Sequence, residues 1–145
     1  MEAKDIQSVL RLHVEAENAH DMQRTLDTLH PECVFEDVAL GQVYRGREGA
    51  AEYYRTWWDA FSLRFRPGAE GMQHFTAGGM VVAEGHFFGT HIGSFMGVAP
   101  TGKEVDFRFV VVVSFRDGLM AGERFYYDQA SLWRQIGASP RSDAP

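Results

Sequence analysis

The sequence predicts an α+β fold, in which helices pack on one face of a curved, mostly antiparallel sheet. Two patterns support this prediction. Up to residue 61, apolar residues recur at the three- and four-residue spacing of amphipathic helices. From residue 63 onwards, alternating and continuous apolar runs are separated by turn residues, which is typical of strands. Helices followed by a series of strands indicate an α+β domain rather than an alternating α/β one.

Three helices are expected in the first 61 residues. The first covers residues 5–20, the second starts near Asp21, and the third covers about 47–61. The second helix must end before Pro31, because proline disfavours the helical conformation of the residue that precedes it. The residues expected to face inward are Ile6, Val9, Leu10 and Val14 in the first helix, Met22, Thr25, Leu26 and Leu29 in the second, and Tyr53, Tyr54, Trp57, Trp58 and Phe61 in the third.

Strands are expected between the second and third helices and throughout the rest of the chain. The expected strands cover residues 33–38, 63–66, 72–76, 80–91, 105–116 and 119–127, and the segment 41–46 is interpreted as a turn region. The segment 107–115 is apolar at nearly every position, so it should be a central strand buried on both faces. Since the helices of one chain can cover only one face and still leave a cavity, we expect the other face to pair with a second copy in a homodimer.

The size and composition of the chain indicate one domain. With 145 residues, of which 45% are hydrophobic, the chain can bury a substantial core, and we expect a single domain over 1–138 and a loose tail over 139–145. The net charge of -6 and the scattered basic residues argue against nucleic acid as a partner. No apolar run reaches the roughly 20 residues that span a bilayer, and no signal peptide is recognisable. We therefore expect a cytoplasmic protein without a membrane partner.

Cysteine and histidine residues do not indicate a metal site. The single cysteine, Cys33, lies in an apolar segment, cannot form an internal disulfide and is expected to be a small buried residue. Glu84 and His86 share one face of a strand, but two side chains make a poor metal site and the sequence indicates no third ligand. We therefore predict that the protein binds no metal.

The hairpin at residues 116–118 determines which face of the sheet carries Asp128. A two-residue turn would pair Arg116 with Leu119, whereas a three-residue loop would pair Phe115 with Leu119. We favour the three-residue loop, because it places Asp128 in a mixed polar and apolar wall of the kind that pockets have. The other members of that expected wall are Asp106, Arg108, Val110, Val112, Ser114, Arg124 and Tyr126.

A glycine-rich stretch and the C-terminal segment resemble a known family. Residues 89–102, GTHIGSFMGVAPTG, are similar to the GTHxGxFxGxPPTG stretch of the SnoaL-like polyketide cyclases, also called ester cyclases. Asp128 followed by RQIG at 134–137 resembles the D…LLRQLG ending of the same group. The resemblance covers nearly the whole chain and implies an NTF2-like, ketosteroid-isomerase-like fold. That fold is a cone-shaped barrel, with a curved mixed, mostly antiparallel sheet wrapped around N-terminal helices.

The resemblance implies a catalytic role for Asp128. This residue matches the Asp that moves a proton between a carbon acid and a developing enolate in the cyclases. An aromatic-lined cavity would raise the pKa of such a carboxyl group towards neutrality, where it can both take and return a proton. In the alternative interpretation, Asp128 pairs with Arg108 or Arg124, or caps a helix near Ser131.

Asp37 is a second candidate base by resemblance. It matches the proton-abstracting Asp of the ketosteroid isomerases. Their oxyanion hole uses a Tyr on the first helix and a protonated Asp on a central strand, and the matching positions here are His13 and an aliphatic residue near Val112. Asp37 is therefore expected to line the cavity, either with or without that mechanism.

Two histidines and several other residues complete the candidate site. His13 lies on the apolar stripe of the first helix, and it is either a hydrogen-bonded core residue or a catalytic one. His91 either orients a carbonyl group or hydrogen-bonds the glycine-rich loop. Tyr54 and Trp58 are expected to line the cavity against a flat substrate. The predicted substrate pocket also includes Arg108, Val112, Ser114 and Tyr126.

The resemblance implies a cofactor-free enzyme that acts on a small apolar or aromatic carbonyl ligand. It would abstract a C–H proton and stabilise an enolate, for cyclisation by an intramolecular aldol reaction or for isomerisation of a polyketide-like or polycyclic carbonyl substrate. Many cyclases of the group carry a Gln and a His where this chain has Val112 and Ser114. Epoxide hydrolysis by Asp106, Arg108 and Asp128 is an alternative. A non-catalytic protein that binds a small ligand or a partner protein is another.

Overall fold

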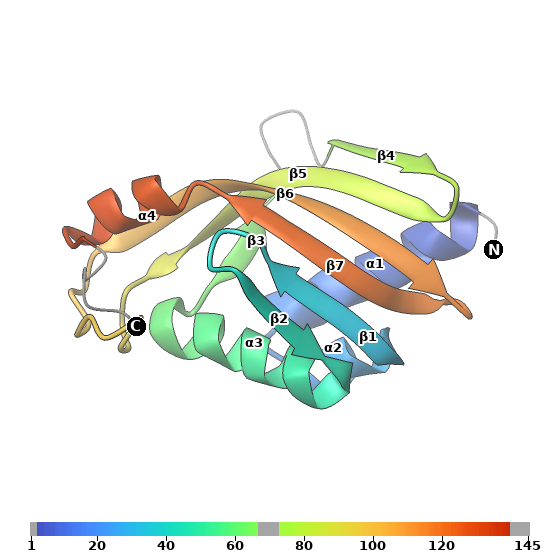
Figure 1. Cartoon of the computed structure of the whole chain (residues 1–145), viewed down its shortest axis with the longest axis horizontal. Helices are drawn as coiled ribbons and strands as arrows, with labels where there is room; N and C mark the ends of the chain where they lie inside the picture. The colour runs from blue at the N-terminus through green and yellow to red at the C-terminus, as the bar shows by residue number, and fades with distance from the viewer. Residues whose placement is uncertain (1–2, 67–72, 140–145) are drawn as a thin grey trace.

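The computed structural model describes residues 3–66 and 73–139, which form a curved sheet with helices against one face and at one end (Figure 1). The helices are α1 (Ala3–Asn18), α2 (Met22–Asp27), α3 (Gly46–Phe61) and α4 (Gln129–Ile136). The strands are β1 (Leu29–Asp37), β2 (Gln42–Arg45), β3 (Arg64–Arg66), β4 (Gln73–Ala77), β5 (Met80–Thr90), β6 (Glu104–Arg116) and β7 (Leu119–Tyr127). This content confirms the predicted α+β class. Within the described ranges, no helix is long and apolar enough to cross a membrane.

The strands form one mixed sheet in the order β2-β1-β7-β6-β5-β3, and β4 pairs with the other end of β5. Among the described strands, β1 and β7 run parallel and the remaining pairs run antiparallel. The long strands β5 and β6 pair over their whole length, and the sheet curves along them (Figure 1). The curved, mostly antiparallel sheet of the sequence prediction is therefore confirmed.

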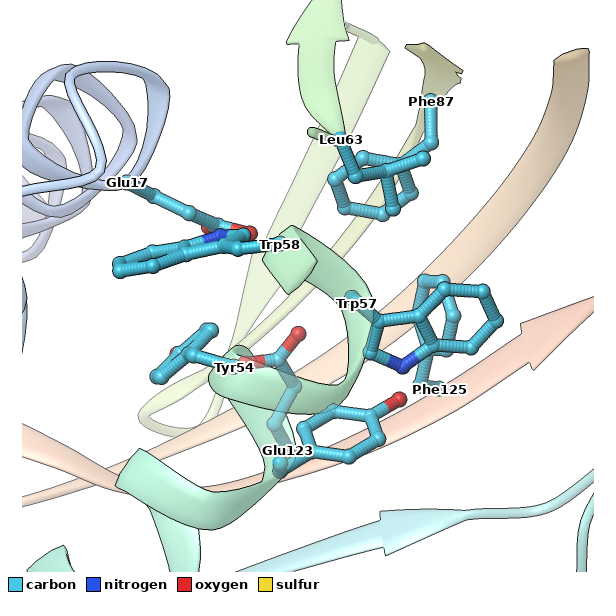
Figure 2. A pocket seen from close by; sticks show the side chains of 9 residues that line it. Glu17, Tyr54, Trp57, Trp58, Leu63, Phe87, Glu123 and Phe125 are labelled. Atoms are coloured by element: carbon cyan, nitrogen blue, oxygen red, sulfur yellow. The ribbon is translucent and has the colours of Figure 1, made fainter. Parts of the chain in front are cut away.

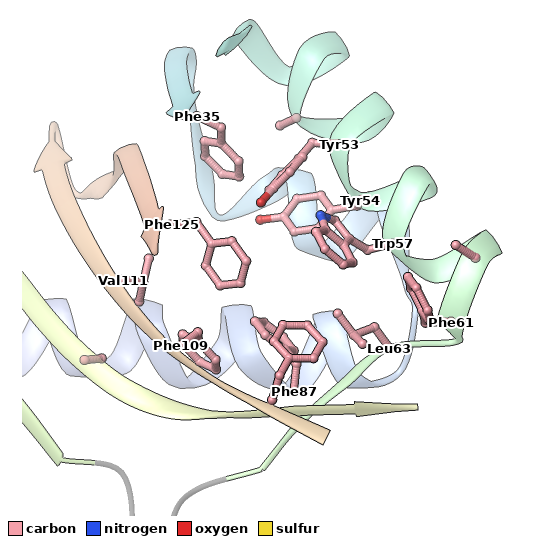
Figure 3. Close-up of a cluster of buried hydrophobic side chains, with 14 of the residues drawn as sticks. Phe35, Tyr53, Tyr54, Trp57, Phe61, Leu63, Phe87, Phe109, Val111 and Phe125 are labelled. Carbon is pink, nitrogen blue, oxygen red and sulfur yellow. The ribbon is translucent and has the colours of Figure 1, made fainter. Parts of the chain in front are cut away.

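The concave inner face of the sheet packs against α1 and α3 around a mainly aromatic core. Every second residue of β6 from Val105 to Val113 is buried, because successive strand side chains point to opposite faces. Figure 3 shows how the strands and α3 meet across this core. Its members there include Phe35 from β1, Phe87 from β5, Phe109 and Val111 from β6, Phe125 from β7, and Tyr53, Tyr54, Trp57 and Phe61 from α3.

One element was not expected from the sequence. β2 forms in the segment that was interpreted as a turn, whereas α4 is the helix near Ser131 that was named as an alternative. In addition, β1 begins at Leu29 and includes Pro31. The pairing of β1 with β7 is interrupted between Leu29 and Val34, so the missing N–H of Pro31 removes no bond from a regular ladder. Of the predicted tail, residues 140–145 lie outside the described residues, as does Met72 of the predicted fourth strand.

The turn between β6 and β7 differs from the predicted three-residue loop. Arg116 pairs with Leu119 across a two-residue turn. Asp117 and Gly118 both have positive φ, at 53° and 78°, as the tightest hairpin turns require. The predicted pairing of Phe115 with Leu119 was therefore wrong, because this two-residue turn matches the twist of the flanking strands.

An extra residue in β7 changes the register a second time. Ser114 pairs with Gly122, and Phe115 pairs with Met120, which leaves Ala121 as a β-bulge. Beyond the bulge, the residues of β7 that pair with the buried positions of β6 are Glu123, Phe125 and Tyr127. Arg124 and Tyr126 pair with Val112 and Val110 and point to the other face.

The expected pocket wall consequently forms on the outer face of the sheet. Val110, Val112 and Ser114 are half-buried there, and Arg108 is exposed. The placement of this wall inside the cavity was wrong. The physical reason is that the alternate residues of β6 include two phenylalanines, and burying these larger side chains against the helices removes more apolar surface from water.

The loop after β5 packs directly on the C-terminal end of α3. The backbone N–H groups of Ile92 and Gly93 donate to the carbonyl oxygen of Ala60, at 2.9 and 3.1 Å. A Cβ atom at Gly93 would overlap the carbonyl oxygen of Asp59, which is part of the helix backbone. Glycine at this position therefore allows the loop to approach the helix so closely.

We predict that Gly93→Ala destabilises the protein by about 1–3 kcal/mol, because the added methyl group forces the loop away from α3. Urea unfolding followed by circular dichroism would measure the change. Ser94→Ala, at the exposed next residue, is the control and should stay within about 0.5 kcal/mol of the original protein. Equal stability of the two variants would contradict the close packing described above.

Candidate functional site

The cavity between the helices and the inner face of the sheet consists of two adjoining pockets. Both pockets are lined by Glu17 of α1, Phe87 of β5 and Glu123 of β7. Both pockets are partly open, and the space that no atom fills measures about 330 Å³ in one and about 540 Å³ in the other when the solvent at their mouths is included. A ligand that occupies both pockets must pass the two glutamates.

The smaller pocket, called the aromatic pocket here, is lined by rings from three elements (Figure 2). These are Tyr53, Tyr54, Trp57 and Trp58 of α3, Phe87 of β5 and Phe125 of β7. Positions 53, 54, 57 and 58 follow helical spacing and therefore project from adjoining parts of one helix face. The structure thus places Tyr54 and Trp58, the two predicted lining residues, in the wall of the cavity.

The larger pocket, called the apolar pocket here, lies between α1 and the middle of the sheet. Its lining is aliphatic and aromatic apart from His13, Glu17 and Glu123. Its apolar members are Leu10 and Val14 of α1, Phe65 of β3, Val81, Ala83 and Phe87 of β5, Phe109, Val111 and Val113 of β6, and Met120 of β7. A flat hydrophobic molecule would be shielded from water by this lining.

His13 is held in a defined orientation at the polar end of the cavity. Its Nδ1 lies 2.7 Å from the hydroxyl of Thr28, which donates its own hydrogen to the carbonyl oxygen of Thr25 at 2.6 Å. Nδ1 must therefore carry a hydrogen and donate to Thr28. Nε2 is left facing the Tyr54 hydroxyl at 3.1 Å and the Glu17 carboxylate at 3.4 Å. Nε2 can therefore accept a proton from a group in the cavity or return one.

The charges around His13 favour its protonated form. Burial by itself would lower the pKa of His13, but the hydrogen bond and negative charge of Glu17, together with the charge of Glu123, raise it above the ordinary value. The negative charge of the glutamates therefore offsets the cost of burying a positive charge on His13.

Glu123 is the carboxyl group best suited to acid–base chemistry. Burial raises the pKa of Glu123 from 4.5 to about 7, an effect that His13 opposes and Glu17 reinforces. Within the described residues, no hydrogen bond to the Glu123 carboxyl group is found. A carboxyl group with a pKa near 7 exists in both forms at neutral pH, which suits a group that takes and returns a proton.

Asp37 lies behind the wall of the aromatic pocket, and its carboxylate is occupied. One oxygen accepts the backbone N–H of Leu40 at 2.9 Å, and the other accepts the hydroxyl groups of Tyr53 and Tyr127 at 3.1 and 3.3 Å. Asp37 is fully buried, and burial raises its pKa although these hydrogen bonds lower it. The expectation that Asp37 lines the cavity was therefore wrong, because its carboxylate is directed to the backbone of Leu40 and to the two tyrosine hydroxyls instead.

His91 fixes the glycine-rich loop and lines neither pocket. Its Nδ1 accepts the backbone N–H of Thr101 at 3.2 Å, and its backbone carbonyl accepts the N–H of Gly102 at 2.9 Å. The ring packs on Phe61 with the centroids 5.1 Å apart, and burial lowers the pKa of His91. Of the two interpretations from the sequence, the geometry matches the loop-binding one.

Asp128 lies outside the cavity. β7 ends at Tyr127, and the exposed Asp128 carboxylate caps α4 by accepting the backbone N–H of Ser131 at 2.9 Å. Its expected position in a pocket wall was therefore wrong, because the face that the even-numbered residues of β7 share with Val110 and Val112 is the outer face of the sheet. The helix cap, named above as the alternative, is what the structure contains.

The remaining predicted pocket residues lie on the outer face of the sheet. Arg108 is exposed and lies 3.7 Å from Glu84, and Tyr126 is exposed as well. Val112 and Ser114 are half-buried on that face. Asp106, the third member of the expected Asp-Arg-Asp cluster, binds Arg66 and His86 instead. The cluster required for the epoxide hydrolase alternative is therefore not assembled in the described chain.

Metal chemistry finds no support in the side chains described. Within residues 3–66 and 73–139, no group of three or more His, Cys, Asp or Glu side chains is placed to hold a metal ion. Cys33 is free and buried, and burial raises the pKa of its thiol, as expected for a small core residue.

Sequence reasoning missed both glutamates of the cavity, although each leaves a signal. Glu17 follows His13 by four residues, so the two side chains share a helix face. Glu123 alternates with Phe125 and Tyr127, so the three share a strand face. The error was to assign the cavity face of β7 from Asp128 rather than from these two aromatic residues.

Comparisons with known proteins agree with this architecture. A family model for the SnoaL-like polyketide cyclases matches residues 7–136. The structure resembles TsrD from Streptomyces laurentii, with 25% identity, coverage of 96% of this chain and 99% of that one, and a TM-score of 0.81. The comparison with curated proteins found no match.

Two further solved structures extend this result. A candidate SnoaL-like polyketide cyclase from Jannaschia sp. CCS1 shares 25% identity, covering 96% of this chain and 95% of its own, with a TM-score of 0.80. An NTF2-like protein of unknown function from Burkholderia pseudomallei shares 20% identity, covering 94% and 100%, with a TM-score of 0.75. The expected NTF2-like cone fold is thereby confirmed.

We predict that Glu123 makes the protein less stable as the pH rises. Between pH 4.5 and about 7, an unfolded Glu123 has lost its proton while the folded one retains it, so the folded state binds more protons and unfolding becomes easier with rising pH. Glu123→Gln should therefore be more stable than the original protein at pH 8, by up to about 3 kcal/mol, and similar to it at pH 4.

Urea unfolding at pH 4 and pH 8 would measure this difference. Glu104→Gln, at an exposed position at the start of β6, is the control and should leave the pH dependence unchanged. If Glu123→Gln and Glu104→Gln behave alike, the carboxyl group of Glu123 titrates at its ordinary pKa and the inference is wrong.

Proposed function

The chain belongs to the SnoaL-like polyketide cyclase family, and we propose that it is a cofactor-free enzyme that moves a proton on a carbonyl substrate. The observation that carries this proposal is the position of Glu123. Its carboxyl group, with a pKa raised to about 7, lies where the aromatic pocket and the apolar pocket adjoin. Such a group is half ionised near neutral pH, where a general base and a general acid are both needed in one catalytic cycle.

The reaction begins with the Glu123 carboxylate. It takes a proton from the carbon next to the substrate carbonyl, and the electron pair of the broken C–H bond forms an enolate. The developing negative charge on oxygen is stabilised by a donor, either the Tyr54 hydroxyl or protonated His13, which lie 3.1 Å apart. The enolate carbon then attacks a second carbonyl carbon of the same molecule, and the alkoxide formed there takes the proton back from Glu123. In an isomerisation, Glu123 instead returns the proton to a different carbon of the conjugated enolate.

The apolar pocket supports a substrate with a flat hydrophobic body. Its lining offers β-branched and aromatic side chains from β5 and β6, and polar atoms are confined to the end with His13 and the two glutamates. A polyketide-like or polycyclic carbonyl compound would lie with its rings in the apolar pocket and its reactive carbonyl at that end. Cyclisation and isomerisation both begin with the same enolate.

Glu123→Gln should reduce the catalysed exchange of carbon-bound hydrogen with deuterated water by at least about 10²-fold, because the amide cannot take the proton. The exchange would be followed by NMR on a cyclic 1,3-diketone. His13→Gln should also lower the rate, with a shifted pH profile, because it removes both a proton donor and a neighbouring charge.

Asp128→Asn provides the comparison between the two candidate carboxylates. It should keep the exchange rate and change the stability little, because the side-chain oxygen of Asn can accept the same backbone N–H of Ser131 and cap α4. If Asp128→Asn abolishes exchange while Glu123→Gln does not, the proposed base is wrong. If no carboxylate variant changes the rate, the non-catalytic binding protein is the better description.

The outer face of the sheet supports a second expectation, a homodimer. Val82, Val110, Val112 and Tyr126 adjoin one another on that face through the paired strands β5, β6 and β7, and Val82 and Tyr126 are 39% and 42% exposed. We predict a dimer through this patch, and Val112→Lys should produce monomers in sedimentation velocity experiments at micromolar concentration. A monomeric original protein would contradict the prediction.

A further inference from the structure

We propose that the aromatic pocket binds the positively charged nitrogen of an amine or quaternary ammonium ligand. The inference follows from the combination of aromatic faces and carboxylates in one lining. It rests on the proposed function only in taking this ligand to be the substrate, so it narrows the substrate class to carbonyl compounds that carry an ammonium group.

The charged residues of the cavity favour a cation. Glu17 and Glu123 line both pockets, and among the described residues no lysine or arginine lines either of them. The basic residue of the lining is His13, whose Nε2 lies 3.4 Å from Glu17. One histidine against two carboxyl groups leaves a surplus of negative charge once Glu123 is ionised, above about pH 7. A neutral or anionic ligand would increase the cost of that charge by excluding water, whereas an ammonium group would compensate it.

Aromatic rings surround the glutamates in the lining of this pocket. Tyr54 and Trp58 stack with their centroids 5.5 Å apart, and Trp57 stands nearly perpendicular to Tyr53 at an interplanar angle of 88°. Trp58 also stacks on His20, with the centroids 4.7 Å apart, so a cation would reach a face of Trp58 by displacing one of these two ring partners. Ring faces of Trp and Tyr attract cations within about 6 Å, and desolvation strengthens the attraction.

Figure 2 shows how the carboxylates and the rings lie in the aromatic pocket. Glu17 reaches in from α1 beside Trp58, and Glu123 reaches in from β7 towards Tyr54 and Trp57. A cation in this pocket would have Glu17 and Trp58 on one side, and Glu123 and Trp57 on the other. The substrate's hydrophobic body would continue into the apolar pocket past the same two glutamates.

Cation binding would also change the protonation of Glu123. The ionisable side chains that act on it or on its neighbours are His13 and Glu17 from α1, Tyr53 and Tyr54 from α3, and Cys33 from β1. An ammonium group placed among them favours the carboxylate, so binding below pH 7 should release a proton. The substrate's own charge would thereby generate the base that the proposed reaction needs.

The test compares two probes of the same shape. Choline and 3,3-dimethylbutan-1-ol differ in having nitrogen or carbon at the branched centre, and thus in charge alone. Isothermal titration calorimetry at pH 8 should show choline binding at least about tenfold more tightly than the alcohol. Choline should bind more weakly at pH 6, with proton release that is visible as a dependence on the ionisation enthalpy of the buffer.

Variants locate the site. Glu17→Gln and Trp58→Leu should each weaken choline binding about tenfold while leaving the affinity for the alcohol nearly unchanged. Glu15→Gln, exposed on the same helix, is the matched control and should bind like the original protein. Circular dichroism would verify that each variant is folded. Equal affinity for the two probes, or choline binding that Glu17→Gln and Trp58→Leu leave intact, overturns the proposal.

The result is independent of the exchange experiment on Glu123. Preferential binding of choline without exchange activity would leave the cation site standing and refute the enzymatic function. Exchange that depends on Glu123, without preference for choline, would leave the enzyme standing and refute the cation site.

Discussion

One extra residue in β7 decides which side chains face the cavity. Without the bulge at Ala121, the two-residue turn would direct Arg124 and Tyr126 towards the helices, since a shift of one residue moves every side chain of a strand to the other face. With the bulge, Glu123 and Phe125 face inward instead. The sheet therefore encloses an apolar cavity with one protonatable carboxyl group from β7, rather than a cavity lined by a guanidinium group.

The secondary structure was largely predictable, because periodicity records which side chains are buried together. The helix expected at 47–61 and the strand expected at 105–116 differ from α3 and β6 by one residue at their first positions. β2 was missed since its four residues are exposed or half-buried and lack an apolar alternation. The register of β7 was not predictable in the same way, because a bulge at a small residue leaves no mark in composition.

The candidate site was predictable where helical spacing defines a face and not where it depends on strand register. His13, Tyr54 and Trp58 were expected at the cavity and lie in its lining. Asp128 was selected by resemblance to a sequence position, but a residue that follows the end of a strand and precedes a helix is also the usual place for a cap. The sequence position alone does not distinguish these two tasks.

Asp37 and Glu123 show that burial of a carboxyl group has different consequences in different surroundings. Asp37 accepts a backbone N–H and two tyrosine hydroxyls, and these bonds stabilise its charge and fix its position. Glu123 is surrounded by rings and by a like charge from Glu17, so its ionised form costs free energy at neutral pH. An amide or an apolar side chain would fill the same space without that cost. A residue that opposes stability where the protein must work is best explained by what it exchanges with a ligand, and the unpaired carboxyl group of Glu123 can offer either a proton or a negative charge.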